Sequence, residues 1–326
     1  MSEMVIVWMP VYNEAAFVGS TIESVLAQTH RDFTLLISDN HSTDATAEII
    51  AAYAARDPRI RMVRPDTHGT SLQHMRWLFD GVLKEQFEQR YSIFIGGHDI
   101  WHFDYLRSLL EAAENNPASA IVYARCAEID VDGKVINTLH GYVHAIEQSR
   151  PLLPISVLSS LTHNVIFGGL WRESLRRRMS MRFLCSAVDH LMVTEMALLG
   201  QISLVPETMM FLRRLPEHGN PHAYKKKHLG DQSNDPNRDL GEQLRWVSEL
   251  VDKAAAGDPF FQQPAALQML RAATFSTYIS RYWNTVVSYE DGINRVFNGP
   301  EIQQLLNLHA HYNATLSAYL DKHAPG

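Results

Sequence analysis

The sequence predicts an α/β fold with a mostly parallel sheet flanked by helices, followed by a helical extension. Two segments near the start carry this prediction, residues 5–14 and 35–44. Each is a short apolar run that stops abruptly in polar residues, and each is followed by a helix-like stretch. Strands of this kind are typical of a parallel sheet whose strand ends hold a ligand. Because the polar residues are acidic and amide-bearing rather than glycine-rich, they favour contacts to a base and ribose over wrapping a pyrophosphate.

Size and composition narrow the class of protein. The 326 residues allow two domains, or one α/β domain with a helical appendage. The net charge of −7 argues against a general nucleic-acid binder, whose footprint would be basic. Cys126 and Cys185 are too few for a disulfide framework and indicate a reducing compartment. No apolar stretch approaches the roughly 20 residues of a membrane span, and no signal peptide is evident. We expect a cytoplasmic protein, with a position peripheral to the inner face of the membrane left open.

Strand and helix patterns alternate through the first half of the chain. This alternation predicts right-handed crossovers and a parallel sheet covered on both faces. The expected strands are residues 5–9, 33–38, 60–64 and 91–95, and the expected helices are residues 14–27, 43–55, 69–86 and 104–114.

The second half is predicted to complete the sheet and then to change character. Further strands are expected at residues 120–125, 127–130, 135–138, 202–205 and 209–213, with a helix at 186–199. Residues 216–238 are rich in Pro, Gly, Asn, His and Lys and predict a mobile loop. Residues 239–326 repeat apolar residues at helical spacing, which is typical of core helices or a dimer seam. The predicted units are therefore residues 1–215, 216–238 and 239–326.

The fourth predicted strand ends in small residues and then an acid, Gly96-Gly97-His98-Asp99. A carboxylate at such an edge, beside a nucleotide diphosphate, is suited to a hard divalent ion that prefers oxygen ligands. His98 is a softer second ligand. A plain helix cap at Asp99 is the structural alternative, and the pattern alone leaves both open.

Several segments together resemble the family 2 glycosyltransferases with the GT-A fold, inverting enzymes that use nucleotide-diphosphate sugars. The segments are residues 9–14, residues 37–44, the stretch from Gly69, and residues 98–106. The resemblance extends through Asp189 and covers roughly the first 215 residues. It implies a Rossmann-like mixed, mostly parallel sheet of the GT-A type.

The resemblance also implies a nucleotide site at the first strand ends. Asp39 is expected to accept a hydrogen bond from the base edge, with a turn-stabilising role as the alternative. For Asp44, a helix cap is the balanced alternative. The expected nucleotide site comprises Pro10, Tyr12, Glu14, Asp39, Asp44, Gly69 and His98.

A metal ion, Mn²⁺ or Mg²⁺, is implied by the same resemblance. The last Asp of the family's Asp-x-Asp-type motif holds the ion against the diphosphate, and that position here is Asp99. The preceding carboxylates are replaced by Gly97 and His98. Three alternatives stay open: a metal held by Asp99 and His98, a metal held weakly, or none. We expect a metal.

The remaining roles are carried over in the same way. Asp189 matches the family's catalytic base, and an ordinary helix N-cap is its alternative. Arg214 and His218 are candidates for the charge of the leaving diphosphate. The acceptor is expected to meet Trp101, Gly168, Gly169 and Trp171, although both tryptophans also fit as core aromatics.

The function implied is an inverting transfer of a sugar, by default from a UDP-sugar, to a hydroxyl of a glycan or lipid-linked saccharide. Surface polysaccharide synthesis is an example. Peripheral membrane contact and homo-oligomerisation through the C-terminal helices are further expectations, with no nucleic-acid partner. A degenerate sugar-nucleotide scaffold without turnover is one alternative. A sugar-phosphate nucleotidyltransferase is disfavoured because residues 9–16 lack a Gly-rich basic loop. A NAD dehydrogenase is disfavoured because no G-x-G-x-x-G follows the first strand.

Overall fold

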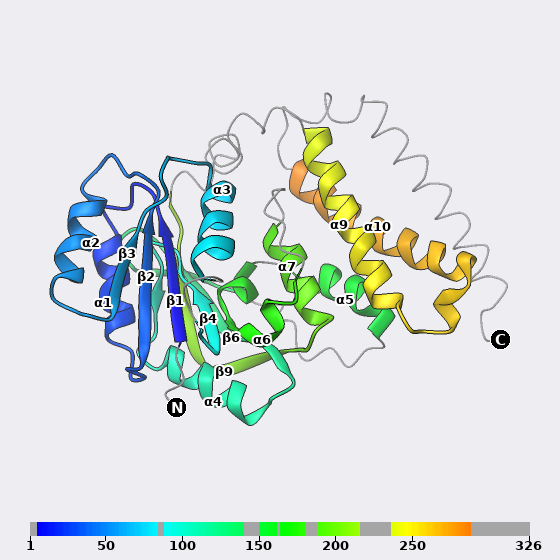
Figure 1. Ribbon diagram of the computed structural model, residues 1–326, viewed down its shortest axis with the longest axis horizontal. Coiled ribbons are helices and arrows are strands. Elements are labelled where there is room, and N and C mark those ends of the chain that lie inside the picture. The colour runs from blue at the N-terminus through cyan, green and yellow to red at the C-terminus, as the bar shows by residue number, and fades with distance from the viewer. Residues whose placement is uncertain are drawn as a thin grey trace.

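A computed structural model describes the protein at residues 5–83, 88–139, 150–161, 164–179, 188–215 and 236–287. A mixed sheet with flanking helices fills one end of the molecule (Figure 1, blue to green), and two long helices lie at the other end (yellow to orange). The α/β architecture expected from the sequence, with helices following the sheet, is confirmed.

The described residues form one nine-stranded sheet with the order β3-β2-β1-β4-β8-β6-β9-β5, and β7 pairs with β6. Pairing is parallel from β3 to β4 and between β6 and β9, whereas β8 is antiparallel to both of its neighbours. The strands are β1 (Val5–Val11), β2 (Phe33–Asp39), β3 (Ile60–Val63), β4 (Tyr91–Phe94), β5 (Ile100–Trp101), β6 (Ser119–Ile129), β7 (Val135–Thr138), β8 (Leu170–Arg172) and β9 (Gln201–Arg213).

The apolar composition of the central strands follows from their burial. Residues 5–9 of β1 are at most 3% exposed, because helices cover both faces of the sheet and each side chain meets a packed layer. β1 and β2 are in parallel register, with Val11 opposite Asp39. The chain therefore leaves both strands at the same height, and the loops that follow begin side by side at the carboxyl edge.

Helices connect the strands and cover them. The capping box of Thr70 and Gln73 starts α3, since the Thr70 side chain accepts from the Gln73 backbone and the Gln73 side chain accepts from the Thr70 backbone. None of the described helices is both long and apolar enough to cross a membrane. The α-helices are α1 (Val18–Leu26), α2 (Thr46–Ala54), α3 (Ser71–Arg76), α4 (Tyr105–Asn115), α5 (Leu153–Ser160), α6 (Glu173–Arg176), α7 (Val188–Ala197), α9 (Pro236–Ala255) and α10 (Pro264–Val287). The short helices are η1 (Trp77–Leu83, of π type), η2 (Arg150–Leu152), η3 (Asn164–Gly168) and η6 (Phe260–Gln262).

The structure joins elements that the sequence divides. Two predicted strands merge into β6 and two others merge into β9, which pair along their length. The register slips where Ala124 faces Val205 but Arg125 faces Met209, so residues 206–208 bulge out of the ladder. Pro206 lies in this bulge and has no N–H to donate to the ladder. For this reason the sequence predicts two separate strands where the structure has one. β5, β8 and α5 were not predicted, because segments this short carry little periodic signal.

The C-terminal helices pack against the rest of the chain. Trp246, Val247 and Leu250 of α9 are at most 1% exposed and belong to the same apolar core as the sheet. Lys253 of α9 forms an ion pair with the buried Glu195 of α7. The predicted loop at residues 216–238 lies outside the described residues up to 235, and α9 begins at Pro236. Residues 288–326 also lie outside them.

A buried ion pair at α6 offers a test of the packing. Glu173 and Arg176 are 1% and 2% exposed, and the guanidinium lies 4.2 Å from the centre of the Phe79 ring. Arg176→Met should lower the free energy of unfolding by up to about 3–5 kcal/mol, because it removes the nearer cation from the buried Glu173 carboxylate and leaves only Arg177, whose Nε is 3.7 Å away. The measurement is urea unfolding followed by circular dichroism.

The control is Arg245→Met. Arg245 forms an i,i+3 pair with Glu242 at 2.9 Å, and its side chain is 62% exposed. Its loss should change the free energy of unfolding by less than about 1 kcal/mol. Equal effects of the two substitutions would contradict the structural importance of the Glu173–Arg176 pair.

Candidate functional site

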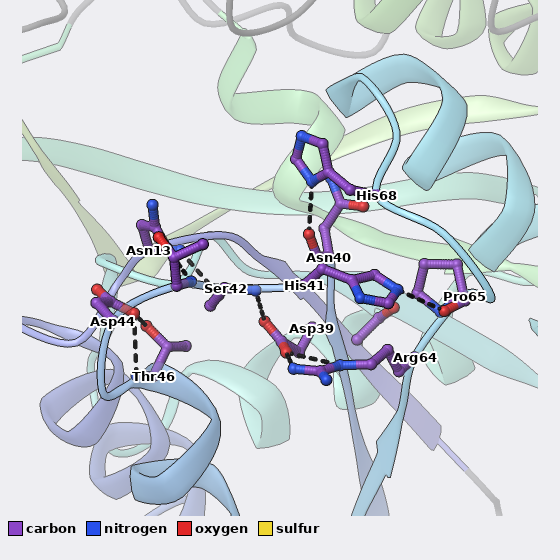
Figure 2. A network of polar contacts seen from close by, with 12 residues as sticks. Asn13, Asp39, Asn40, His41, Ser42, Asp44, Thr46, Arg64, Pro65 and His68 are labelled. Atoms are coloured by element: carbon purple, nitrogen blue, oxygen red, sulfur yellow. Dashed lines mark hydrogen bonds and ion pairs between the residues drawn. The ribbon is translucent and has the colours of Figure 1, made fainter.

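Hydrogen bonds lock together the loops that follow β1 and β2 (Figure 2). The Asn13 backbone N–H donates to Ser42 Oγ at 2.9 Å, and its side-chain oxygen accepts from the Thr43 N–H at 2.8 Å. Asn13 and His41 both have positive φ, 56° and 61°. Asn and His are among the residues that adopt this left-handed conformation most readily outside glycine. These hydrogen bonds of Asn13 with Ser42 and Thr43, which we call the clasp, therefore hold two tight turns side by side at the carboxyl edge.

Asp44 belongs to this clasp. Its Oδ1 accepts from the Thr46 N–H at 3.0 Å and from the Thr46 hydroxyl at 2.5 Å, and its Oδ2 accepts from the Ala15 N–H at 3.1 Å. Burial raises the pKa of Asp44, but these donors outweigh it and lower the pKa overall. The side chain thus ties the start of α2 to the loop after β1, and its contact with the nucleotide stays a prediction.

Asp39 is fully buried, at 0% exposed. Its Oδ1 accepts from the Ser42 N–H at 3.0 Å, and its Oδ2 accepts from Arg64 Nε at 3.0 Å and from Arg64 Nη2. Burial raises the pKa of Asp39, while the bonds from Ser42 and Arg64 together lower it below its usual value. The carboxylate is therefore charged and compensated, and the Arg64 side chain that compensates it stays about half-exposed.

Arg64 was missed by the sequence analysis. The only available signal is its position, directly after the β3 strand and so at the same carboxyl edge as Asp39. A basic residue at a strand end is common, and nothing in the sequence pairs it with an acid 25 positions earlier.

The loop after β3 is held against the loop after β2. The Asn40 side chain donates to the Gly69 carbonyl at 2.7 Å and accepts from the Gly69 N–H at 3.1 Å, while His68 Nδ1 lies 2.7 Å from the Asn40 carbonyl. The Tyr12 and His68 rings meet with centroids 4.7 Å apart. Three predicted nucleotide residues, Tyr12, Asp39 and Gly69, are thereby brought to one edge, although Gly69 acts through its backbone.

A second acidic group lies where β1 and β4 end. Both Glu14 carboxylate oxygens are 3.1 Å from His98 Nδ1, and Glu14 is only 7% exposed. Asp99, at 5% exposed, accepts from the Arg213 backbone N–H at 3.0 Å, and burial raises its pKa. Arg213 also donates to the His98 carbonyl at 3.0 Å, so the end of β9 fixes this turn.

The two glycines before His98 are required by space. A Cβ on Gly96 would lie 2.7 Å from Asp99 Oδ2, and a Cβ on Gly97 would lie 2.8 Å from Val11 Cγ1. Gly97, at a position where the family's motif carries a carboxylate, brings its backbone close to Val11 and Glu14, and Gly96 brings its backbone close to Asp99.

The donor set was compared with the needs of a divalent ion. Within the described residues, no group of three or more His, Cys, Asp or Glu side chains is arranged to hold a metal. Mg²⁺ and similar ions are commonly held by one or two carboxylates together with substrate phosphates and waters, rather than by a closed protein cage. Asp99, with Glu14 and His98 beside it, fits an ion shared with a diphosphate and does not fit an ion held by protein alone.

Asp189 lies in the first turn of α7, where its Oδ1 accepts from the His190 N–H at 2.9 Å. The other end of α7 leads into Gln201, whose N–H donates to the Ala118 carbonyl at the amino end of β6. Because β6 runs in the same direction as β1 and β4, α7 descends from the carboxyl edge toward the amino edge. Asp189 therefore lies toward the edge that carries Glu14 and Asp99.

The residues expected at the acceptor are placed elsewhere. Trp101 and Trp171 are 3% and 2% exposed and pack in the core, so neither presents a ring face to a sugar. Gly168 and Gly169 are also packing positions. A Cβ on Gly169 would lie 2.7 Å from the Val122 carbonyl oxygen, and the Gly168 carbonyl accepts from Tyr105 at 3.3 Å. The core alternative thus explains all four residues.

Of the two residues expected at the phosphates, the structure describes Arg214 but not His218. Arg214 forms an ion pair with Glu128, which also accepts from Asn137 at 3.0 Å. About half of the Arg214 side chain stays exposed. His218 lies outside the described residues. Pro10 is the penultimate residue of β1 and reaches the edge just before Tyr12.

Comparison with known proteins agrees with this geometry. Residues 6–153 match the family described as glycosyl transferase family 2. The chain is 32% identical over 109 residues to the putative teichuronic acid biosynthesis glycosyltransferase TuaG of Bacillus subtilis, covering 33% of this chain and 41% of that protein. It is 25% identical over 122 residues to the glycosyltransferase GlyG of Streptococcus pneumoniae, covering 37% of this chain and 39% of that protein. The matches thus span about two-fifths of each relative's length.

The fold comparison reaches further along the chain. S. aureus TarS 1-349 in complex with UDP-GlcNAc superposes with a TM-score of 0.63 at 14% identity, covering 95% of this chain and 80% of that one. GalNAc-T7 with UDP, GalNAc and Mn²⁺ superposes with a TM-score of 0.53 at 12% identity, covering 88% and 58%.

The fold and its polar carboxyl edge define a Rossmann-like α/β domain. Proteins of this class bind their ligands at the carboxyl ends of the strands. The family comparison makes the class more specific: residues 6–153 are similar to glycosyl transferase family 2, and the fold is that of GT-A glycosyltransferases of known structure.

The buried imidazole of His74 gives the site a pH-dependent stability. Its Nε2 lies 2.6 Å from Ser38 Oγ at the end of β2, and burial lowers its pKa from 6.5 to about 4. Between these two values the unfolded chain binds a proton that the folded chain does not. The free energy of unfolding should therefore fall by up to about 3 kcal/mol as the pH drops from 6.5 to 4.

The measurement is urea unfolding at pH 7, 6, 5 and 4.5. His74→Asn keeps an amide beside Ser38 and should show a shallower pH dependence than the wild type. Asp39 has a lowered pKa and loses its contribution only below about pH 4. His30→Asn, at the surface beside Asp32, is the control and should keep the wild-type slope. A wild-type slope in His74→Asn would show that the ring is not the group responsible.

Proposed function

We propose that the protein is an inverting glycosyltransferase that moves a sugar from a UDP-sugar to a hydroxyl of a glycan or lipid-linked saccharide. The observation that carries the proposal is the meeting of Glu14, His98 and Asp99 on the same sheet edge as Tyr12 and the Asp39–Arg64 pair. One end of this edge offers aromatic and polar groups for a nucleoside, and the other end offers carboxylates for a metal–diphosphate.

The comparisons support the proposed substrates. TuaG is named for teichuronic acid biosynthesis, the E. coli relative that is 26% identical over 145 residues is a chondroitin synthase, and TarS was solved with UDP-GlcNAc. All three names concern polysaccharides or a UDP-sugar. The shape of the pocket determines which donor sugar and which acceptor hydroxyl are used, and the names of the relatives do not specify that shape.

Each residue in the proposed mechanism has one task. Asp189 removes the proton from the acceptor hydroxyl as its oxygen attacks C1 of the sugar from the face opposite the nucleotide, so that the configuration at C1 inverts. Asp99 would hold Mn²⁺ or Mg²⁺ together with the diphosphate, and the bound ion would supply positive charge against the developing charge of the leaving group. Tyr12 borders the nucleoside, and His98 is oriented by Glu14.

The remaining expectations continue as proposals. Homo-oligomers and peripheral membrane contact through residues 239–326 are compatible with helices α9 and α10, although α9 already buries one face within the chain. Arg214 and His218 are retained as candidates for the phosphates. A sugar-nucleotide-binding protein without turnover is the second candidate, favoured by the small number of metal-binding side chains in the described residues.

The catalytic base is tested with Asp189→Asn. The variant should bind UDP with wild-type affinity by calorimetry, since Asp189 serves the acceptor side. The release of UDP from UDP-sugars in the presence of saccharide acceptors should fall by about 10²–10⁴-fold, because the amide cannot take a proton. Asp258→Asn, in the turn before η6, is the matched control and should keep the wild-type rate. A near-normal rate in Asp189→Asn would place the base elsewhere.

The metal is tested by thermal unfolding with UDP, GDP, dTDP and CDP, each with and without Mn²⁺. UDP with Mn²⁺ should raise the melting temperature, because a ligand at about 100 times its Kd stabilises the folded state by about 2.7 kcal/mol. Asp99→Asn should lose the Mn²⁺-dependent part of the shift and keep the metal-independent part. A full shift without metal would remove the ion from the mechanism, and no shift with any nucleotide would argue against the transferase.

A further inference from the structure

Arg213, at the end of β9, lies between two turns that are far apart in the sequence. In the sheet, β9 has β6 on one side and β5 on the other. β6 is parallel to β9 and β5 is antiparallel to it, so the end of β9 lies between the turn that follows β6 and the turn that precedes β5. The second of these is the Asp99 turn, residues 96–99. Arg213 is the last residue of β9 and is only 6% exposed.

Arg213 bonds to the Asp99 turn at two points. Its backbone N–H donates to Asp99 Oδ1 at 3.0 Å. Its side-chain Nε donates at 3.0 Å to the carbonyl of His98, which belongs to the same peptide group as the Asp99 N–H. The first bond directs the carboxylate, and the second fixes the peptide plane beside the Asp99 Cα. The other carboxylate oxygen, Oδ2, lies over Gly96, where a Cβ would approach it to 2.7 Å.

The other end of the guanidinium is held by the turn between β6 and β7. Nη1 donates to the Asp130 carbonyl at 2.9 Å and to the Val131 carbonyl at 2.8 Å. The Asp130 side chain in turn accepts from the backbone N–H groups of Asp132 and Lys134, at 3.0 and 2.9 Å. The Phe17 ring packs against the guanidinium, with its centre 4.9 Å from Cζ. Arg213 therefore ties the Asp99 turn to a closely bonded hairpin.

The arrangement requires the shape of an arginine side chain. A guanidinium presents five donors on three nitrogens in a rigid plane, so Nε and Nη1 can reach acceptors on two separate turns. Lysine carries its donors on a single nitrogen at the end of a flexible stem. A lysine at this position would keep the positive charge and lose the fixed geometry of the bridge.

We propose that Arg213 is a positioning residue for the metal–diphosphate, because it fixes the Asp99 carboxylate in the orientation that receives the ion. It acts through Asp99 and not on the substrate. The inference deepens the proposed function and rests on it, since it takes Asp99 to be the ligand of the ion. Groups that orient a metal ligand typically contribute about 10–100-fold to metal affinity or activity.

A role in stability alone makes a different prediction, and Arg172 of β8 provides the comparison. Its Nε and Nη2 donate to the carbonyls of Ser119 and Ala113 at 2.9 and 2.7 Å, and its guanidinium lies 5.2 Å from the centre of the Tyr91 ring. Tyr91 begins β4, whereas Asp99 follows that strand, so Arg172 belongs to the opposite edge of the sheet. Loss of either arginine should lower stability, but only loss of Arg213 should lower metal affinity.

The experiment measures the affinity of the full chain for Mn²⁺ at saturating UDP, from the electron paramagnetic resonance signal of free Mn²⁺. Arg213→Gln should bind Mn²⁺ about 10–100-fold more weakly than the wild type. Its affinity for UDP without metal, measured by calorimetry, should stay within about twofold of the wild-type value, because the bonds of the nucleoside edge are untouched. Arg172→Gln is the matched control and should keep the wild-type affinity for Mn²⁺.

Folding of each variant is checked by circular dichroism. Arg213→Lys is measured alongside, because it retains a cation beside Phe17 and threatens folding less than the neutral glutamine. With one nitrogen to serve two turns, it should still weaken Mn²⁺ binding at least about fivefold.

The outcomes separate the inference from the function on which it rests. If the folded Arg213 variants bind Mn²⁺ within about twofold of the wild type, or if Arg172→Gln weakens Mn²⁺ binding equally, the positioning role is overturned while the proposed function stands. A wild type that binds UDP but takes up no Mn²⁺ overturns the inference and leaves the nucleotide site in place. If the wild type binds neither, the proposed function fails and the inference fails with it.

Discussion

The parallel register of β1 and β2 is the constraint on which the site depends. With Val11 opposite Asp39, the two chains reach the carboxyl edge together, and Asn13, Ser42, Thr43 and Thr46 can join their turns. A slip of one residue would turn every side chain of β2 to the other face. Asp39 would then leave the core, and Arg64 would lose the group that orients it.

Several titratable groups near this edge are buried, and their surroundings determine which of them carry a charge. The carboxylate of Asp39 is buried and compensated by Arg64, and the imidazole of His74 beneath it is buried neutral. Asp99 is buried beside the Arg213 backbone, while burial favours its protonated form. An arriving cation would favour the ionised form of Asp99. At the proposed metal site, metal and proton would therefore compete for the Asp99 carboxylate.

The sequence was sufficient for the fold because the alternating strands and helices are long and strongly apolar. It was also sufficient to bring Tyr12, Asp39, Gly69 and Asp99 to one edge, since the carboxyl ends of parallel strands coincide. It could not give the pairing of Arg64 with Asp39 or of Glu14 with His98, which join residues 25 and 84 positions apart. It also could not show that Trp101 and Trp171 are core residues, because tryptophan is equally suited to the core and to a sugar-binding surface.

The packing of α9 has a consequence for how the molecule comes apart. Trp246, Val247 and Leu250 share one apolar core with the sheet, and Lys253 reaches a buried acid on α7. Removing the helix would expose that core and leave Glu195 without its ammonium partner. The sheet and α9 should therefore melt in one cooperative transition, and amide protons in both should exchange with solvent through the same global opening.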